Sequence, residues 1–327
     1  MKRAFVTGPT GQDGSYLCDF LQEKGYEVHA LVRQSTQFTS DRWGHLRGAM
    51  QKGLIVHHGD ITDASLMRTL IEVIKPDEVY NLAAQSDVGQ SFDQPINTVG
   101  ATALGPLNLL EAIRHSCPQA KFYQASSSEM FGKAKETPQK ESTRFHPRSP
   151  YGCAKTFGHY ITQNYREAYG IYACSGILFN HESERRGENF VTRKITRAVG
   201  RIKFGRQIEL KLGNTDPKRD WGYAPDYVEA MWMMLQHHEP KDFVIGTGIQ
   251  HSVQQFVEAA FKVVNLDWRS YVKEDPKFVR PAEVDTLQAD WSRAKLELGW
   301  QPKVNFNQLV KKMVDHDLQL AYDEIYK

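Results

Sequence analysis

The chain opens, at residues 3–14, with the stretch RAFVTGPTGQDG. Its first part, Arg3–Thr7, is a short apolar run typical of a strand, and the glycines Gly8, Gly11 and Gly14 follow at once. Glycines placed there let backbone amides approach a diphosphate, and the N-terminus of the next helix favours its negative charge. The stretch therefore predicts a strand, a phosphate-binding turn and a helix. The alternative interpretation is a tight turn that binds no phosphate.

The same rhythm of strand and helix continues outward from this start. In the first half we expect strands at Arg3–Thr7, Glu27–Val32, Leu54–His58, Glu78–Ala83, Lys121–Ser126 and Tyr172–Leu178, and helices at Gly14–Lys24, Ala64–Ile74, Ala103–Arg114 and Tyr151–Tyr169. Beyond residue 180 we expect helices at Val191–Val199, Asp226–His237 and Val253–Val264, and strands at Ile208–Leu212 and Phe243–Thr247.

This order predicts an α/β fold, a Rossmann-type doubly wound parallel sheet with a smaller C-terminal α/β substrate domain. Residues 1–180, with a returning segment near 215–250, are expected to form the cofactor-binding domain. Residues 181–327 are expected to form most of the substrate domain.

The composition excludes several classes of protein. The 327 residues carry 41 Lys and Arg against 39 Asp and Glu, so no nucleic-acid or membrane partner is expected. The N-terminus reads as a strand rather than a signal peptide, and no apolar run is long enough to span a bilayer. The cysteines Cys18, Cys117, Cys153 and Cys174 have no metal-like spacing, so we expect no metal and a cytoplasmic protein with reduced thiols. Cys153 is expected to pack on the far side of its helix.

The chemical groups cluster around the fifth strand and the helix after it. Tyr151 and Lys155 are four residues apart, so they lie on one face of a helix. We expect the ammonium to lower the pKa of the phenol and make it a proton shuttle. Ser127 and Glu129 follow the strand, at the edge where such folds bind ligands. Capping of a helix is the alternative role for that Ser and Glu.

The second and third strands bear on the choice of cofactor. The second strand ends at Arg33, where an NAD-binding protein usually has an acidic residue. A cation there would attract a 2′-phosphate, which predicts NADP, although an ordinary solvated arginine is the alternative. Asp60 is placed to accept a hydrogen bond from the adenine amino group, and the small residues Ala83 and Ala84 would let a dinucleotide pass close.

These residues together resemble the extended short-chain dehydrogenase/reductases, and among them most closely the GDP-mannose 4,6-dehydratase family. The resemblance covers nearly the whole chain. It rests on GPTGQDGSYL at 8–17, NLAAQS at 81–86, SSSEMFG at 126–132, YGCAK at 151–155, LFNHESERRG at 178–187, FVTRK at 190–194, KRDWG at 218–222 and RPAEVD at 280–285.

The resemblance implies a hydro-lyase that makes a 4-keto-6-deoxy sugar from GDP-mannose through an internal redox cycle with NADP. It implies that Tyr151 takes the proton of the sugar's 4-hydroxyl, that Ser127 hydrogen-bonds this hydroxyl, and that Glu129 removes the C5 proton. Lys155 would also hold the nicotinamide ribose.

The resemblance also implies two sets of binding residues. The cofactor set is Gly8, Thr10, Gly11, Gln12, Asp13, Gly14, Arg33, Asp60, Ile61, Leu82, Ala83, Ala84, Ser86, Tyr151, Lys155, His181 and Arg186. The substrate set is Ser86, Asn180, Lys194, Arg219, Arg280 and Glu283. Arg185 and Arg186 could instead reach a neighbouring subunit's cofactor, so a homotetramer or homodimer is expected.

Some positions depart from the family pattern and leave alternatives open. Ser127 replaces the usual Thr, Asp87 a His and Glu184 a Pro, and Asn189 also departs. A GDP-manno-heptose 4,6-dehydratase is therefore one alternative. A nucleotide-sugar epimerase or reductase on the same scaffold is another, although it would need no base such as Glu129. A non-catalytic NADP-binding protein is the third.

Overall fold

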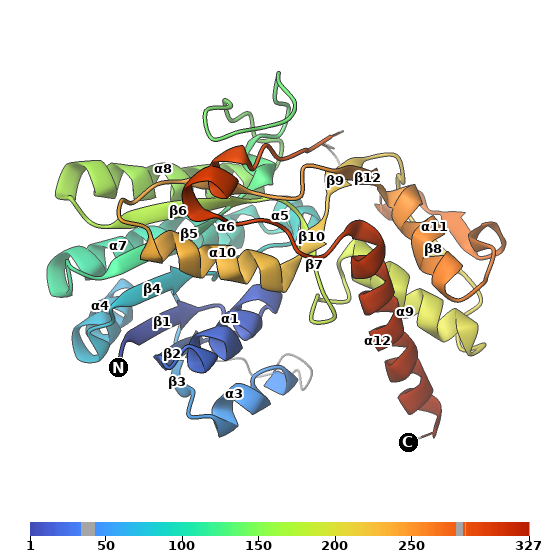
Figure 1. Cartoon of the computed structure of the whole chain (residues 1–327), viewed down its shortest axis with the longest axis horizontal. Helices are drawn as coiled ribbons and strands as arrows, with labels where there is room; N and C mark the ends of the chain where they lie inside the picture. The colour runs from blue at the N-terminus through green and yellow to red at the C-terminus, as the bar shows by residue number, and fades with distance from the viewer. Residues whose placement is uncertain (34–42, 279–283, 285, 327) are drawn as a thin grey trace.

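The computed structural model describes residues 1–33, 43–278, 284 and 286–326 (Figure 1). At its centre lies a seven-stranded sheet in which every neighbouring pair of strands is parallel. The strand order is β11-β6-β5-β4-β1-β2-β3. The strands are β1 (Arg3–Thr7), β2 (Glu27–Val32), β3 (Ile55–His58), β4 (Glu78–Asn81), β5 (Lys121–Ser127), β6 (Ala173–Leu178) and β11 (Phe243–Ile245). The expected α/β class with a doubly wound parallel sheet is confirmed.

Helices cover both faces of this sheet (Figure 1). One face is packed by α4 (Ala64–Ile74), α7 (Gly105–Ser116) and α8 (Pro150–Tyr169), and the other by α1 (Gln12–Glu23) and α10 (Ala224–Gln236). Buried apolar side chains fill both layers, including Leu109 on α7 and Leu17 on α1. The inner strands, such as β4 and β6, are buried on both faces because they lie between two layers of helices, whereas the edge strand β3 is partly exposed.

A second group of elements, here named the α9 group, lies beside the sheet, at the right of Figure 1. It contains α9 (Val191–Lys203), α11 (Val253–Val263) and α12 (Phe306–Tyr326), with the strands β8 (Leu210–Leu212) and β13 (Val272–Glu274). These elements share a separate apolar cluster that includes Ile195, Phe256 and Met313. The expected division of the chain near residue 180 remains a proposal, and β11 is a later segment that joins the main sheet.

The bounds of the sheet elements agree closely with those expected from the sequence. β1, β2 and α4 have the expected bounds, and the ends of most other expected elements differ by one to three residues. The expected helix at 103–114 begins as a π-helical turn, Gly100–Leu104, before α7. Several elements were not expected: α3 (Arg47–Gln51), α5 (Val88–Asp93), α6 (Pro95–Val99), β7 (His181–Glu182), β9 (Lys218–Asp220), β10 (Gly222–Tyr223), β12 (Gln250–Ser252) and α12.

Within the described parts of the chain, no helix is both long and apolar enough to cross a membrane.

Candidate active site

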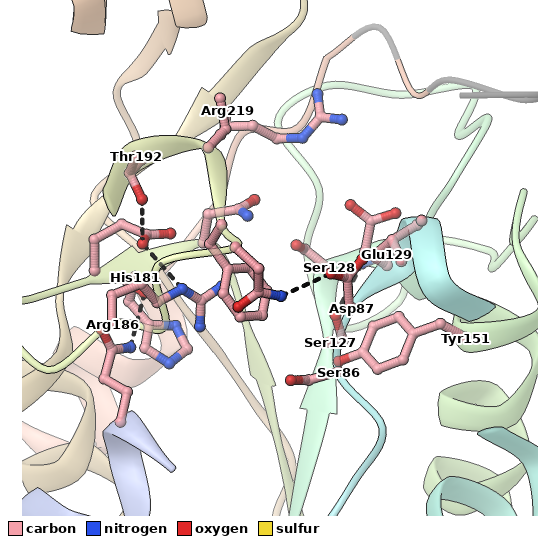
Figure 2. Close-up of a pocket in the computed structure, with 18 of the residues that line it drawn as sticks. Ser86, Asp87, Ser127, Ser128, Glu129, Tyr151, His181, Arg186, Thr192 and Arg219 are labelled. Atoms are coloured by element: carbon pink, nitrogen blue, oxygen red, sulfur yellow. Dashed lines mark hydrogen bonds and ion pairs between the residues drawn. The ribbon is translucent and has the colours of Figure 1, made fainter. Parts of the chain in front are cut away.

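A cleft of about 1020 Å³ runs along the carboxyl ends of the sheet strands and faces the α9 group. Figure 2 shows Ser127, Ser128, Glu129 and Tyr151 on one wall, with Arg219 and His181 across from them. Parallel strands of this topology bind ligands at this edge. Most of the site residues expected from the sequence line this cleft.

The glycine turn has the shape of a cradle for a diphosphate. Gly8 has a φ of +70°, and a Cβ there would lie 2.9 Å from the Leu82 carbonyl oxygen. A Cβ on Gly14 would lie 2.2 Å from the Gly8 carbonyl oxygen, so no side chain fits at either position. Helix α1 begins just after Gly11 and has no side-chain cap. Its first amides are therefore available to an anion, and the residues present fit a dinucleotide.

Buried hydrogen bonds fix the floor of the cleft across three strands. The Thr7 hydroxyl donates to Asn81 Oδ1 at 2.7 Å, and Asn81 Nδ2 donates to Gln124 Oε1 at 2.8 Å. Gln124 Nε2 and the Lys155 ammonium both donate to the Ala125 carbonyl, at 3.1 and 2.7 Å. This chain of contacts holds Lys155 of α8 against the end of β5.

The proposed catalytic residues lie together in the cleft and are buried. Ser127, Glu129, Tyr151 and Lys155 are all less than a tenth exposed, and the Ser127 hydroxyl accepts a hydrogen bond from the Glu129 amide at 3.2 Å. Pro150 begins α8, and the side chain of Ser149 caps this helix by accepting from the Gly152 amide. The cap sets the start of the helix and thereby points Tyr151 into the cleft.

The electrostatics of this group differ from the expectation. Burial raises the pKa of Tyr151 to about 12, although a hydrogen bond to Ser127 acts in the opposite direction. Burial also lowers the pKa of Lys155 to about 8. The expected lowering of the phenol's pKa by the ammonium is therefore wrong, because removal from water outweighs the charges nearby. The Lys155 ammonium lies 5.7 Å from the centre of the Tyr151 ring.

Asp13 and His181 form an ion pair that joins the glycine turn to β7. His181 Nε2 lies 2.8 Å from Asp13 Oδ2, and the ring stacks on Tyr227 at 4.4 Å. Burial alone would lower the pKa of His181, but the Asp13 carboxylate outweighs it and the pKa is raised. Gln12 adds a hydrogen bond from its amide to the His181 carbonyl at 3.0 Å. Gln12 and Asp13, two of the expected cofactor residues on α1, thus also bind the protein itself.

Arg186 lines the same cleft from the loop after β7. Its Nε lies 3.0 Å from a carboxylate oxygen of Glu182, and its guanidinium lies 3.6 Å from the centre of the Phe190 ring. Arg185 points elsewhere: it contacts Asp19 at 2.8 Å and lies 4.1 Å from the ring of Tyr16 on α1. The two neighbouring arginines therefore have different partners.

The far end of the cleft contains the expected substrate residues Asn180, Lys194 and Arg219. Asn180 Oδ1 has no hydrogen-bond partner among the described residues. The Arg219 guanidinium is buried and donates to the Val284 carbonyl at 2.7 Å. Arg280 and Glu283 lie outside the described residues.

Five expected cofactor residues do not line the cleft formed by the described part of the chain, namely Thr10, Arg33, Asp60, Ile61 and Ala83. Arg33 is exposed at the end of β2. Asp60 accepts hydrogen bonds from the Thr62 amide and hydroxyl, at 2.9 and 2.7 Å. Ala83 lies between two residues, Leu82 and Ala84, that do line the cleft.

Several cleft residues are not among those predicted to bind cofactor or substrate. Asp87 accepts a hydrogen bond from Asn189 at 2.8 Å, and this contact joins loops that are 102 residues apart (Figure 2). Lys277 adds a cation, and Asp93 adds a carboxylate. Only the departure of Asp87 and Asn189 from the family pattern was a signal, and it did not show that the two side chains would be in contact.

Cys153, expected to be packed, is exposed because it lies on the outer face of α8.

Comparisons with known proteins agree with this geometry. Residues 5–313 match the family described as GDP-mannose 4,6 dehydratase. "GDP-mannose 4,6 dehydratase 1" of Arabidopsis thaliana is 56% identical over 99% of this chain and 91% of the relative. "GDP-mannose 4,6 dehydratase" of Homo sapiens is 49% identical over 97% of this chain and 91% of the relative. The solved UDP-glucose 4-epimerase of Thermotoga maritima, with UDP-glucose, has a TM-score of 0.84 and 25% identity, covering 99% of this chain and all of that one.

Proposed function

We propose, because the chain belongs to the GDP-mannose 4,6-dehydratase family, that it removes water from GDP-mannose and yields GDP-4-keto-6-deoxymannose. The enzyme is a hydro-lyase with NADP as its cofactor. The observation that supports this most strongly is the position of Glu129. A buried carboxylate lies on the same wall as Tyr151 and Ser127, in one cleft with the glycine turn.

The glycine turn and the start of α1 would hold the cofactor diphosphate, and Lys155 and Arg186 would add cations. When bound, NADP would supply a reversible hydride acceptor, so that the hydride removed from C4 of the sugar can be returned to C6 after water has left. Arg33 stays a prediction as the contact of the 2′-phosphate, since it is an exposed cation at the end of β2.

Tyr151, Ser127 and Glu129, on one wall of the cleft, have complementary roles in proton transfer. The Tyr151 phenol would exchange the proton of the sugar's 4-hydroxyl, with the Ser127 hydroxyl as a hydrogen-bond partner of the same oxygen. Oxidation at C4 makes the neighbouring C5 proton acidic. Glu129 would remove that proton and then donate one to the departing 6-hydroxyl, which leaves as water. A carboxylate can perform both transfers, because it becomes neutral when it takes the C5 proton and regains its negative charge when it gives a proton to the 6-hydroxyl.

The far end of the cleft would bind the GDP portion of the substrate. Lys194 and Arg219 supply positive charge for the diphosphate, and Asn180 supplies an amide. Arg280 and Glu283 stay predictions from the sequence. Ser86 lines the cleft between the two ends and could contact sugar or cofactor.

We propose a homodimer or homotetramer located in the cytoplasm. The helices α6 and α8, which pack against each other, expose Ile96, Val99, Phe157 and Tyr160, with exposed fractions of 85, 40, 41 and 52%. Apolar side chains that are gathered on one face favour contact with another protein surface. Cys18, Cys117 and Cys174 are buried free thiols, which is consistent with a reducing compartment.

The reaction is tested by incubating the purified protein with GDP-mannose and catalytic NADP, and measuring the mass of the product. We expect loss of one water with no net formation of NADPH. A product of unchanged mass would indicate epimerisation and contradict the proposal. UDP-glucose serves as the matched control and should remain unchanged.

A further inference from the structure

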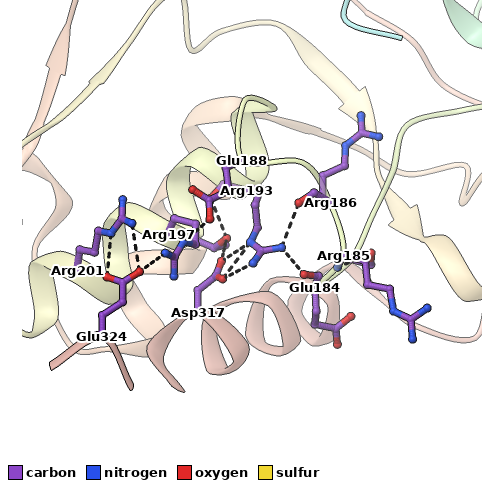
Figure 3. Close-up of polar contacts among 11 residues, drawn as sticks. Glu184, Arg185, Arg186, Glu188, Arg193, Arg197, Arg201, Asp317 and Glu324 are labelled. Atoms are coloured by element: carbon purple, nitrogen blue, oxygen red, sulfur yellow. Dashed lines mark hydrogen bonds and ion pairs between the residues drawn. The ribbon is translucent and has the colours of Figure 1, made fainter. Parts of the chain in front are cut away.

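A buried ion pair joins α9 to the C-terminal helix α12, outside the cleft (Figure 3). Arg193 Nε and Nη2 lie 2.8–2.9 Å from the Asp317 carboxylate. The two side chains are only 6 and 0% exposed. The Thr196 hydroxyl donates to the same carboxylate at 2.6 Å. Desolvation makes such a pair costly, so its presence is weak evidence of a role in stability alone.

The remaining nitrogen of Arg193 contacts the backbone of another segment. Nη1 donates to the carbonyl of Glu184 and, at 3.1 Å, to the carbonyl of Arg186 (Figure 3). One guanidinium thus contacts a helix through two nitrogens and a loop through the third. Only a planar fork can satisfy both sets of acceptors at once.

The loop held in this way carries a cation into the cleft. Arg186 lines the cleft, whereas Arg193 lies between the cleft residues Thr192 and Lys194 and does not line it among the described residues. The positive charge of Arg186 acts on two other residues of the cleft. It lowers the pKa of both Tyr151 and Asp13, although burial is the largest influence on each.

The loop has further contacts besides those from Arg193. In its backbone, the Arg186 amide donates to the Ser183 carbonyl at 3.1 Å and the Arg185 amide donates to the Ser183 hydroxyl at 3.1 Å. The carboxylate of Glu184 accepts hydrogen bonds from the hydroxyls of Tyr16 and Tyr223, at 3.1 and 3.3 Å. Arg185 pairs with Asp19 on α1. These contacts attach the side chains of Glu184 and Arg185 to α1 and β10, whereas the carbonyls of Glu184 and Arg186 are held by Arg193, from α9 and α12.

We propose that Arg193 and Asp317 are positioning residues, which fix the 184–186 loop so that Arg186 is held ready to bind the anionic cofactor. This rests on the proposed function, because it concerns the NADP end of the same cleft. Asp317 orients the guanidinium, Arg193 holds the loop carbonyls, and Arg186 makes the contact. Helix α12 thereby contributes to cofactor affinity without touching the cofactor.

The test is direct binding of NADPH to Arg193→Lys, measured by fluorescence titration in the absence of sugar. Lysine keeps the charge beside Asp317 but cannot also donate to both loop carbonyls. We expect NADPH to bind about tenfold more weakly, on the order of one charge-assisted contact. The KM for GDP-mannose at saturating NADP should stay unchanged. An affinity equal to that of the unaltered protein would overturn the proposal.

Two further variants separate positioning from stability. Arg201→Ala removes another ion pair between α9 and α12, the one with Glu324 at 3.2 Å, and leaves the loop untouched. It should bind NADPH normally. Arg186→Ala should weaken NADPH binding, and adding Arg193→Lys to it should cause no further loss, because both changes act through Arg186. Full additivity of the two losses would contradict the proposal.

A last variant covers the case in which Arg193→Lys does not fold. Arg193→Met combined with Asp317→Leu replaces the buried pair by apolar side chains, a change that folded proteins often tolerate. It also removes the donors to the loop, so the same loss of NADPH affinity is expected. Failure of the unaltered protein to bind NADPH would count against the proposed function, whereas normal binding by these variants would count against the positioning role alone.

Discussion

For Tyr151 and Lys155, the sequence predicts the positions of the side chains but not their pKa values. Their spacing predicts a shared helix face, and the structure gathers both side chains in the cleft. Their pKa values could not be predicted from spacing, because burial is the largest influence on both and depends on how the whole chain folds around them. Removal from water acts on each group alone, and it outweighs the attraction expected between the two.

The lowered pKa of Lys155 has a consequence for stability. Its pKa is 10.5 unperturbed and about 8 in the folded protein, so between these values the unfolded chain binds more protons. Stability due to this group therefore rises as the pH increases from about 8 to about 10.5, by about 3 kcal/mol in total. The measurement is the free energy of unfolding of the protein relative to Lys155→Met across that range. A difference that does not change with pH would contradict the account.

Glu129 is the residue on which the type of reaction depends. Glu129→Gln keeps the shape but removes the base, so we expect dehydration to fall by about 10²–10⁴-fold, the usual contribution of general base catalysis. Reduction of the nicotinamide by the first step should remain detectable by absorbance. Asp93→Asn, the same change elsewhere in the cleft, is the matched control and should cause a much smaller loss. Equal losses would remove Glu129 from its role.

At the scale of elements, the pair Asp13–His181 connects α1 to β7. The raised pKa of His181 stabilises the fold below its ordinary value of 6.5, and this contribution is lost as the pH rises through the folded value. The lowered pKa of Asp13 contributes above its ordinary value of 3.8 and is lost as the pH falls. The pair is therefore most stabilising between these limits, in mildly acidic solution.

Asp13→Asn should accordingly reduce the free energy of unfolding by about 1–3 kcal/mol near pH 5.5, and by less near pH 9. Chemical denaturation at the two pH values checks this. Asp19→Asn is the matched control on the same helix, because its partner is a guanidinium rather than an imidazole. Its effect should be the same at both values, and a similar pH-independent loss for Asp13→Asn would contradict the assignment.

Elements were predicted accurately where the pattern that specifies them lies within the segment itself. β1, β2 and α4 have strong apolar patterns bounded by turn residues, and their bounds were predicted correctly. The helix α12 was missed, although Leu309, Val310, Met313 and Val314 form an apolar stripe along it. Short strands such as β7 and β10 could not be predicted, because each is only two residues long and depends on the other for its hydrogen bonds.

At the scale of the whole molecule, the cleft lies between two packed units, the sheet with its helices and the α9 group. The motif order predicted that these segments would share one site, but not the contacts between them. Asp87 and Asn189, or Arg193 and Asp317, are brought together by the fold from positions more than 100 residues apart. Contacts between residues so far apart cannot be predicted from a local sequence pattern.

The exposed apolar face of α6 and α8 gives a prediction about assembly. Phe157→Lys places a charge at that face, so we expect the oligomer to dissociate or weaken. Light scattering coupled to size-exclusion chromatography measures the mass. Ile208→Lys, at an apolar side chain 85% exposed elsewhere, is the matched control and should leave the mass unchanged. An unaltered mass for Phe157→Lys would place the interface on another face.

The most direct test of the central claim follows a label within the sugar. GDP-mannose with deuterium at C4 is converted with unlabelled NADP, and the product is analysed by mass spectrometry and NMR. Internal hydride transfer predicts a product lighter by one water that retains the deuterium, now at C6. A product that has lost the label, or one with the mass of the substrate, would contradict the account.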